Sequence, residues 1–371
     1  MRVQCCETLE SCTPFLADWA ALAETAAFGE WFAGPEWIIP LIKTYFTASR
    51  LAICFVYKGE ALVGVVPLTE EAHGSNHCRP HLAFPVNSHV RRIGLLASVR
   101  PEEVLQVVFA HLAVRSQPVS RSCLGLLQVP EGEWLDCAVR TAAEQSGLAR
   151  LTQFETRSAV IDVPNGWQEY VASRTSEQLH PLRKQRKLKA RNSEQWEFRE
   201  TEATGDFADC WARVLHVESR SWKHADGTSL VNDLGAEPFY WAVAMRHAQR
   251  GKLRIDLLER NGEPVAHTLG VVHGRSYYLL KHSYDEAHRA LSPGFQTLWF
   301  TLERRVAEGC TRLDLLGDEM SWKRAVATSL PRYVSHQLFT PTSLACQWCR
   351  LTEQVLKPIA RAVEVKRLAK R

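Results

Sequence analysis

Two stretches of the chain share one layout, and this repetition constrains the fold more than any other feature of the sequence. Residues 53–68 form a β-rich run, a tight turn at Gly59 and a second β-rich run. Residues 253–272 show the same arrangement around Gly262. Each stretch predicts a β-hairpin, because a short glycine-containing turn separates two runs rich in β-branched and aromatic side chains.

The elements that follow each hairpin also agree. A helical pattern at 101–115 and an apolar strand at 123–129 follow the first hairpin, and 294–309 and 312–316 repeat this order after the second. Chance similarity between two common hairpins is the alternative, and the shared order of elements favours duplication over it. We therefore predict an α/β (α+β) fold with two copies of one unit, each a mixed, mostly antiparallel sheet flanked by helices.

The length of the chain agrees with two domains, because 371 residues exceed what one hydrophobic core usually fills. A turn cluster at 164–166 predicts an N-terminal domain at 1–165 and a C-terminal domain at 166–342. The segment 343–371 is helical in pattern and basic, so we interpret it as a C-terminal helical appendage. Hydrophobic residues at 46% and charged residues at 23% exclude a largely disordered chain.

The composition also bears on the compartment. The 11 cysteines are odd in number and scattered, and the N-terminus is polar without an apolar export segment. No apolar run approaches the roughly 18 residues that a membrane span needs. We expect a cytoplasmic protein with reduced thiols and no transmembrane segment. A net charge of +4 is too small to indicate nucleic-acid binding by itself.

Several motifs of the second half occur in a characteristic order. They are Tyr277-Tyr278, Tyr284-Asp285, Ser292-Pro293-Gly294 at the start of a helix, the strand and acidic turn 313–319, and Trp322-Lys323. This pattern resembles the CelD/BcsL family of GNAT-like acetyltransferases, which is similar to the FemAB aminoacyl transferases. The resemblance extends from about Phe32 to Phe339 and is most specific between Gly251 and Lys323.

The resemblance implies a tandem GNAT-like fold with acetyl-CoA or another acyl-CoA as the donor. In such a fold the strands 276–284 and 312–316 part, and the donor lies between them. The acceptor would be a small molecule or a saccharide, because the family is associated with exopolysaccharide production. The usual donor loop is Arg/Gln-x-x-Gly-x-Gly/Ala, whereas this chain has Ser292 at the first glycine and Trp322 where relatives carry Tyr. The N-terminal copy has no comparable loop, which implies that it is degenerate.

The predicted donor site lies at the start of the helix after Ser292. Exposed N–H groups and the positive end of a helix dipole suit a pyrophosphate there, although Ser-Pro is also an ordinary way to begin a helix. Alternation along 276–284 places Tyr278, Leu280, His282 and Tyr284 on one face of the strand. The candidate donor-binding residues are Arg289, Ser292, Gly294, Phe295, His282 and Tyr284.

Four residues are candidates for catalysis. Lys323 and Glu319 are four residues apart, which places them on one helix face as an oxyanion-stabilising lysine with a base, or as a surface ion pair. Asp318 is the alternative carboxylate for the acceptor's proton. Glu218 shares a helical stripe with apolar side chains, so burial is expected to raise its pKa and suit it to accept a proton. A carboxylate paired with a basic side chain is the competing interpretation of Glu218.

Two further patterns bear on metal and polyanion binding. Cys346 and Cys349 with the His216-x-Glu218 motif do not complete a zinc-deaminase signature, because Ala345 stands where proline is needed, so no metal is expected. The segment Arg183–Arg191 is densely basic and spreads its charge around a helix. It is a solvated surface helix or a contact for a polyanion such as tRNA. Two alternatives to acyl-CoA transfer therefore stay open: an aminoacyl-tRNA-dependent transferase and a non-catalytic polyanion-binding scaffold.

Overall fold

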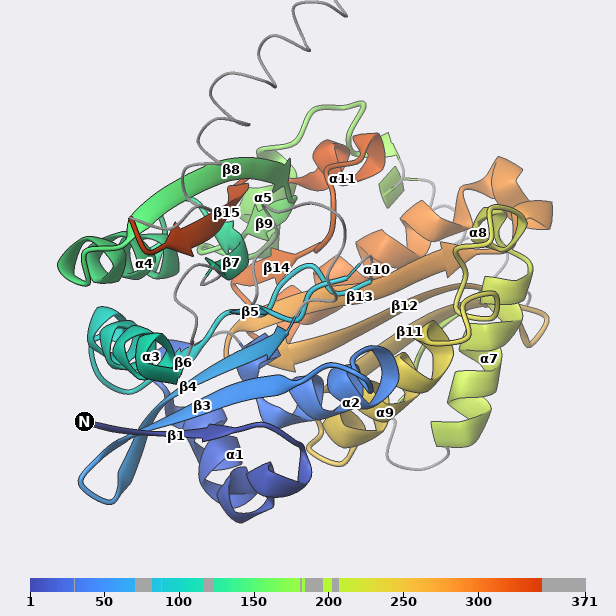
Figure 1. The fold of residues 1–371 in the computed structure, drawn as a ribbon. Coiled ribbons are helices and arrows are strands. Elements are labelled where there is room, and N and C mark those ends of the chain that lie inside the picture. Colours follow the sequence, from blue (N-terminus) through green and yellow to red (C-terminus); the bar gives the residue numbers. More distant parts are fainter. Residues whose placement is uncertain are drawn as a thin grey trace, which may run out of the picture. The chain divides into compact units, whose positions relative to one another are not determined.

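The computed structural model divides the chain into two compact units. It describes residues 1–29, 31–70, 82–87, 89–115, 123–180, 182–183, 196–201 and 207–341. Unit 1 comprises Met1–Glu155 and the segment that begins at Arg332, and unit 2 comprises Thr156–Pro331. Each unit is an α/β structure built on one sheet (Figure 1).

Unit 1 contains the first hairpin. Its strands are β1 (Arg2–Cys6), β2 (Phe28–Gly29), β3 (Leu51–Lys58), β4 (Ala61–Glu70), β5 (Leu82–Ala83), β6 (Leu96–Ala97), β7 (Cys123–Pro130), β8 (Ala149–Arg157) and β15 (Arg332–Phe339). Its helices are η1 (Glu10–Phe15), α1 (Leu16–Thr25), η2 (Trp31–Ala33), α2 (Pro35–Tyr45), α3 (Pro101–Arg115) and α4 (Trp134–Gln145). The sheet order is β1-β3-β4-β5-β7-β15-β8, and β2 and β6 form a short branch beside β4.

Unit 2 repeats this plan. Its strands are β9 (Val160–Asp162), β10 (Trp196–Thr201), β11 (Leu253–Arg260), β12 (Glu263–His273), β13 (Ser276–Tyr284) and β14 (Arg312–Asp314). Its helices are α5 (Trp167–Ala172), α7 (Phe207–Ser219), α8 (Trp222–Ala225), α9 (Ala236–Ala248), η4 (Glu286–Leu291), α10 (Pro293–Ala307) and α11 (Ser321–Val326). The sheet order is β10-β11-β12-β13-β14-β9.

The two sheets share one topology, which confirms the predicted fold class. In each unit an antiparallel hairpin, β3–β4 or β11–β12, follows an antiparallel edge strand. Each sheet then has one parallel step, β5 with β7 in unit 1 and β13 with β14 in unit 2. The next strand, β15 or β9, is antiparallel to that last strand. Both predicted hairpins, both helices and both apolar strands lie where the sequence placed them.

The division between the units differs from the predicted 1–165 and 166–342. β9 precedes residue 165, yet it pairs with β14 and buries Val160 and Ile161 in unit 2. β15 precedes residue 342, yet it pairs with β7 of unit 1. The turn at 164–166 separates β9 from α5 within unit 2 instead of separating domains. The predicted appendage 343–371 lies outside the described residues.

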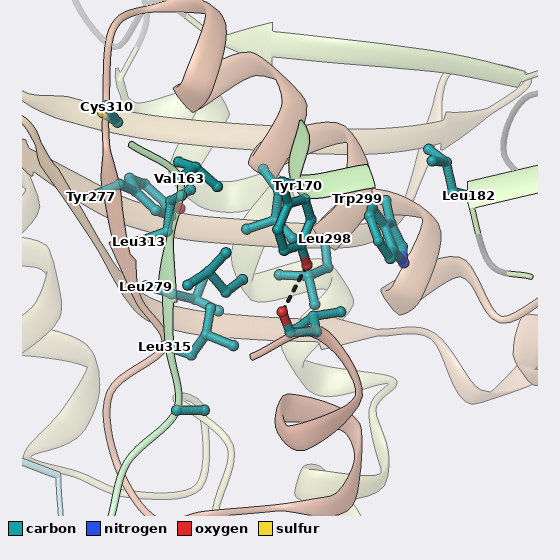
Figure 2. Packing of buried hydrophobic residues seen from close by; sticks show 14 residues of the cluster. Val163, Tyr170, Leu182, Tyr277, Leu279, Leu298, Trp299, Cys310, Leu313 and Leu315 are labelled. Carbon is teal, nitrogen blue, oxygen red and sulfur yellow. Dashed lines mark hydrogen bonds between the residues drawn. The ribbon is translucent and has the colours of Figure 1, made fainter. Parts of the chain in front are cut away.

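Unit 2 has a core between its sheet and the helices α5 and α10 (Figure 2). Tyr277 and Leu279 of β13 and Leu313 of β14 pack there against Leu298 and Trp299 of α10. Tyr170 of α5 joins the same cluster, and its hydroxyl donates to the carbonyl oxygen of Val326 at 2.7 Å. This bond fixes the end of α11 against the core, which matters because α11 carries Lys323.

Gly270 of β12 provides a test of this core. A Cβ at position 270 would lie 2.3 Å from Cζ and Oη of Tyr277, a buried ring that has no room to move. We expect Gly270→Ala to lower the free energy of unfolding by about 2 kcal/mol or more, as overpacking of a dense core does. Urea denaturation of the full chain measures this. Combining it with Tyr277→Leu should recover part of the loss, and additive losses would contradict the proposed clash.

Candidate active site

Strands β13 and β14 pair over only three residues and then part. The parallel register joins Ser276 to Arg312, Tyr277 to Leu313 and Tyr278 to Asp314. Beyond this point β13 runs on to Tyr284, whereas the N–H of Leu315 donates to the carbonyl oxygen of Ala159 at 3.0 Å. The predicted parting of these strands is therefore present in the structure. Residues 279–284 of β13 have no strand partner on the β14 side within the described part of the chain.

A β-bulge lies one residue beyond the start of this unpaired stretch. In the β12–β13 register Gly270 opposes Leu279 and Leu269 opposes Lys281, so Leu280 has no partner in the ladder. Such an extra residue changes which face of the sheet the following side chains reach. The predicted alternation, with Tyr278, Leu280, His282 and Tyr284 on one face, is wrong for this reason.

The bulge divides the side chains of β13 between two faces. Tyr277 and Leu279 before it, and His282 and Tyr284 after it, lie on the α10 face. Lys281 lies on the opposite face, where its ammonium nitrogen is 4.6 Å from the ring centre of Tyr240 in α9. Lys281 and His282 are neighbours in one strand, yet their side chains lie on opposite faces of the sheet.

On the α10 face, β13 approaches the first turn of α10 closely. Nε2 of His282 donates to the carbonyl oxygen of Gly294 at 2.9 Å. Burial lowers the pKa of His282 to about 3 despite that bond, so the ring is neutral near pH 7. A Cβ at Gly294 would lie 2.9 Å from Cδ1 of Tyr284 and 3.2 Å from Nε2 of His282. Glycine is needed here because the helix backbone lies against these two rings.

The start of α10 has the geometry of an anion site. Ser292 has φ +54°, the left-handed conformation that glycine adopts most easily, at the position of the first glycine in the usual donor loop. Pro293 follows as the first helical residue, and the first helical bond runs from the N–H of Gln296 to the carbonyl oxygen of Ser292. The N–H groups of Gly294 and Phe295 precede that bond and have no acceptor within the helix. Arg289 is exposed in the preceding η4, with Glu286 3.9 Å away.

Lys323 is buried beside the turn that follows β14. Its ammonium donates to the carbonyl oxygens of Leu316 and of Asp318, the latter at 3.1 Å. The turn has left-handed residues at Leu316 and Gly317, which point these carbonyls toward the lysine. Trp322 links this turn to the α10 face, because its ring centre is 5.1 Å from that of His282.

The predicted pairing of Lys323 with Glu319 is wrong. α11 begins only at Ser321, so Glu319 precedes the helix and the i,i+4 relation does not apply. Glu319 instead contacts Arg324, and Lys323 binds backbone carbonyls. The side chain of Asp318 is exposed. Lys323 therefore organises the turn after β14, and the carboxylate of Asp318 is the one that faces solvent.

Glu218 lies on the other face of the sheet, within an ionised network. It is fully buried; its Oε1 is 3.1 Å from Nε2 of His267 and 3.9 Å from the ammonium of Lys223, and its Oε2 accepts the N–H of Leu230 at 3.2 Å. Burial by itself raises the pKa of this carboxyl. The hydrogen bond from His267 and the charge of Lys223 outweigh burial and lower the pKa to about 2. Glu218, which was expected to accept a proton near neutral pH, is therefore ionised there and poorly suited to that role.

The structure brings most of the predicted residues into one continuous region of unit 2. Gly294, Tyr284, His282 and Lys323 are connected through direct contacts and Trp322. Glu218 reaches the same strand from its opposite face, because Lys223 donates to the carbonyl oxygen of His282. Sequence reasoning missed Lys223, His267 and Lys281. For Lys281, the available signal was a charged residue directly after the apolar run 277–280 of the strand.

Of the predicted polyanion contact Arg183–Arg191, only Arg183 is described, and its guanidinium donates to Oγ of Ser176 at 2.6 Å. Cys346 and Cys349 lie outside the described residues. No described group of three or more His, Cys, Asp or Glu residues is placed to hold a metal ion. None of the helices in the described ranges is both long and apolar enough to cross a membrane.

Comparison with known proteins agrees with this geometry. Residues 179–324, which lie within unit 2, match the family model described as "Acetyltransferase (GNAT) domain". Unit 2 therefore contains a GNAT domain. No curated protein matches the chain. The CelD/BcsL resemblance stays a prediction. The strand parting, the bulge and the start of α10 all lie within the matched residues.

Solved structures show that the similarity extends over both units. FemX matches with a TM-score of 0.60 and 10% identity over 91% of this chain and 97% of that chain. The C-terminal domain of a putative lysylphosphatidylglycerol synthetase from Agrobacterium fabrum matches with 0.52 and 12% identity over 87% and 91%. L-PGS from Bacillus licheniformis matches with 0.51 and 10% identity over 92% and 96%. At these identities the shared property is the fold.

The Glu218 network predicts a specific pH dependence of stability. A carboxyl whose pKa is lowered on folding stabilises the protein above its unfolded pKa, near 4.3, and loses this contribution as the pH falls toward 2. We expect Glu218→Gln to cost about 3 kcal/mol at pH 6 and much less at pH 2.5, measured by urea denaturation. Asp209→Asn, on the same helix but exposed, is the control and should cost little at either pH. An equal loss at both pH values would contradict the ionised network.

Proposed function

We propose that the chain is an acyltransferase that moves an acyl group from acyl-CoA, with acetyl-CoA as one such donor, directly to an amine or hydroxyl. The observation that carries this proposal is the parting of β13 from β14 at Tyr278, next to the first turn of α10. The unpaired stretch of β13 offers backbone groups to an extended donor, and α10 offers N–H groups to its phosphates. The GNAT domain in unit 2 supports the same reaction class.

The residues at the start of α10 fit an acyl-CoA pyrophosphate. The N–H groups of Gly294 and Phe295 point out of the first turn, and no acidic residue occupies that turn. Ser292 gives the loop its left-handed bend, and Arg289 is exposed close by. His282 and Tyr284 line the helix backbone from the strand side. Bound acyl-CoA would supply the thioester that the acceptor attacks.

The transfer needs no covalent enzyme intermediate. The acceptor nitrogen or oxygen forms a bond to the thioester carbonyl carbon, the carbon–sulfur bond breaks, and the acceptor's proton leaves to a base. We assign oxyanion stabilisation to backbone N–H groups near the bulged Leu280, with Lys323 fixing the opposite side of the gap through the 316–318 turn. Asp318 is the exposed carboxylate assigned to the proton. A sugar or polysaccharide precursor is the acceptor class that the CelD/BcsL resemblance favours.

A second candidate function has a specific observation in its favour. The chain-wide structural matches include FemX and two proteins described as lysylphosphatidylglycerol synthetase or L-PGS. The segment Arg183–Arg191 is densely basic in sequence, as contact with an aminoacyl-tRNA would require. An aminoacyl-tRNA donor is therefore the alternative to acyl-CoA. The third candidate function is a non-catalytic scaffold that binds a polyanion. A result in which the chain binds neither acyl-CoA nor aminoacyl-tRNA would support it.

Donor binding tests the assignment of the α10 site. We expect acetyl-CoA to bind the full chain, Gly294→Ala to weaken binding about tenfold or more because its Cβ displaces Tyr284, and Arg289→Ala to weaken it less. Isothermal titration calorimetry gives the affinities. Arg275→Ala, an exposed arginine at the other end of β13, is the control and should bind normally. No binding at millimolar acetyl-CoA would exclude this donor.

Turnover tests the role of Lys323. Removing one group that stabilises the oxyanion or fixes its donors typically lowers kcat about 100-fold. We expect a loss of that size for Lys323→Met in an assay of CoA release, with a smaller effect on KM. Arg324→Met removes the neighbouring ion pair with Glu319 and should keep kcat within about threefold. Equal losses in the two variants would show that only the packing of α11 matters.

A further inference from the structure

A pair of lysines lies on the face of β13 that is turned away from α10. The ammonium of Lys281 stands 4.6 Å from the ring centre of Tyr240, and the side chain is half-buried. Within the described part of the chain it has no hydrogen bond and no ion pair. Lys223 reaches the same strand from α8 and donates to the carbonyl oxygen of His282, the residue that follows Lys281.

The carboxylates near these lysines already accept hydrogen bonds from other groups of the chain. Glu218 is held by His267, by the N–H of Leu230 and by the charge of Lys223. Asp233 accepts the N–H groups of Gly235 at 2.8 Å and Ala236 at 3.1 Å, at the start of α9. The donors of the Lys281 ammonium therefore remain unfilled by the surrounding carboxylates. An anion from outside the chain would stabilise a half-buried cation of this kind.

Two buried polar atoms on the same face are also unsatisfied. His267 and Ser283 are direct partners in the β12–β13 ladder, and both side chains are almost fully buried. Nδ1 of His267 and Oγ of Ser283 have no hydrogen-bond partner among the described residues. Native structures rarely leave such atoms unpaired, so polar groups from a ligand or from ordered water belong in this region.

We propose that Lys281 and Lys223 form a subsite for an anionic group, a carboxylate or a phosphate, of the acyl acceptor. This inference rests on the proposed acyl transfer and names the acceptor class. The bulge at Leu280 places Lys281 on this face while His282 stays on the donor face. An acceptor anchored by its anion at Lys281 is therefore held one residue from the bulged Leu280, near which the oxyanion-stabilising N–H groups are assigned.

The ionisation of the pair agrees with this arrangement. Burial and the neighbouring Lys223 lower the pKa of Lys281 to about 8, while Glu218 and Asp233 oppose that change. Burial also lowers the pKa of Lys223, and Glu218 opposes it. Tyr240 faces Lys281 from α9 as a neutral ring. The subsite is therefore cationic below about pH 8, and anion binding should weaken as the pH rises through that value.

Chemical labelling tests the subsite without knowledge of either substrate. Pyridoxal 5′-phosphate forms an imine with an unprotonated lysine amine, with loss of water, and borohydride traps it for peptide mass spectrometry. Pyridoxal is the matched probe without the phosphate. We expect the ratio of phosphorylated to unphosphorylated label to be about tenfold higher at Lys281 than at Lys58, an exposed lysine of unit 1. Lys223→Met should reduce this preference, and Lys281→Met should abolish the signal.

The outcome decides the proposal whether or not acetyl-CoA binds. Equal ratios at Lys281 and Lys58 would overturn it, even if the protein is an active acyltransferase. A raised ratio together with absent CoA binding would keep the anion subsite and refute the acyl-CoA donor.

Turnover then separates the two anion chemistries. Phosphoethanolamine against ethanolamine, and glycine against glycinamide, differ only in the anionic group. With an active donor, we expect Lys281→Met to raise KM about tenfold for the preferred anionic member and to leave its neutral partner unchanged, whereas Lys281→Arg should retain most of the affinity. Equal KM changes for both members of each pair would contradict the subsite.

Discussion

The early end of the β13–β14 pairing is the constraint on which the candidate site depends. Three residue pairs hold the strands together, and the bulged Leu280 lies two residues after the last of them, Tyr278. A regular strand would have placed Lys281 with Tyr277 and Leu279 in the apolar core beneath α10. The extra residue instead sends Lys281 to the α7 face and His282 to the α10 face, so one strand supplies both the proposed donor side and the proposed acceptor side.

The surrounding core keeps this irregular strand in place. Arg305 of α10 is fully buried and contacts Glu200 at 2.7 Å, Glu308 at 3.0 Å and Asp256 at 3.4 Å. Asp256 also accepts a hydrogen bond from Thr301 of α10 at 2.7 Å. These charged contacts tie α10 to β10 and β11, while its apolar side packs on β13. The first turn of α10 is thereby held against His282 and Tyr284, where Gly294 allows the close approach of the helix backbone.

Local patterns allowed the sequence to predict the hairpins, the helix at 101–115 and the start of α10, because turn residues and periodicity record local structure. The sequence could not predict that β9 pairs within unit 2 and β15 within unit 1, since pairing between strands that are far apart in the chain leaves no local pattern. The bulge was missed because a strict alternation of faces was assumed along 276–284, and only the β12 register reveals Leu280 as unpaired. For the same reason the pKa of Glu218 was assigned the wrong direction: its partners His267 and Lys223 come from other elements.

A comparison of the two copies favours unit 2 as the location of the proposed donor site. Each unit has a parallel strand step and a helix in the corresponding place, α3 in unit 1 and α10 in unit 2. The first turn of α3 carries Glu102 and Glu103, whereas that of α10 has no acidic residue. Carboxylates at a helix N-terminus occupy the positive end of the dipole and repel a phosphate. The electrostatics of these two first turns therefore assign anion binding to α10 and agree with a degenerate N-terminal copy.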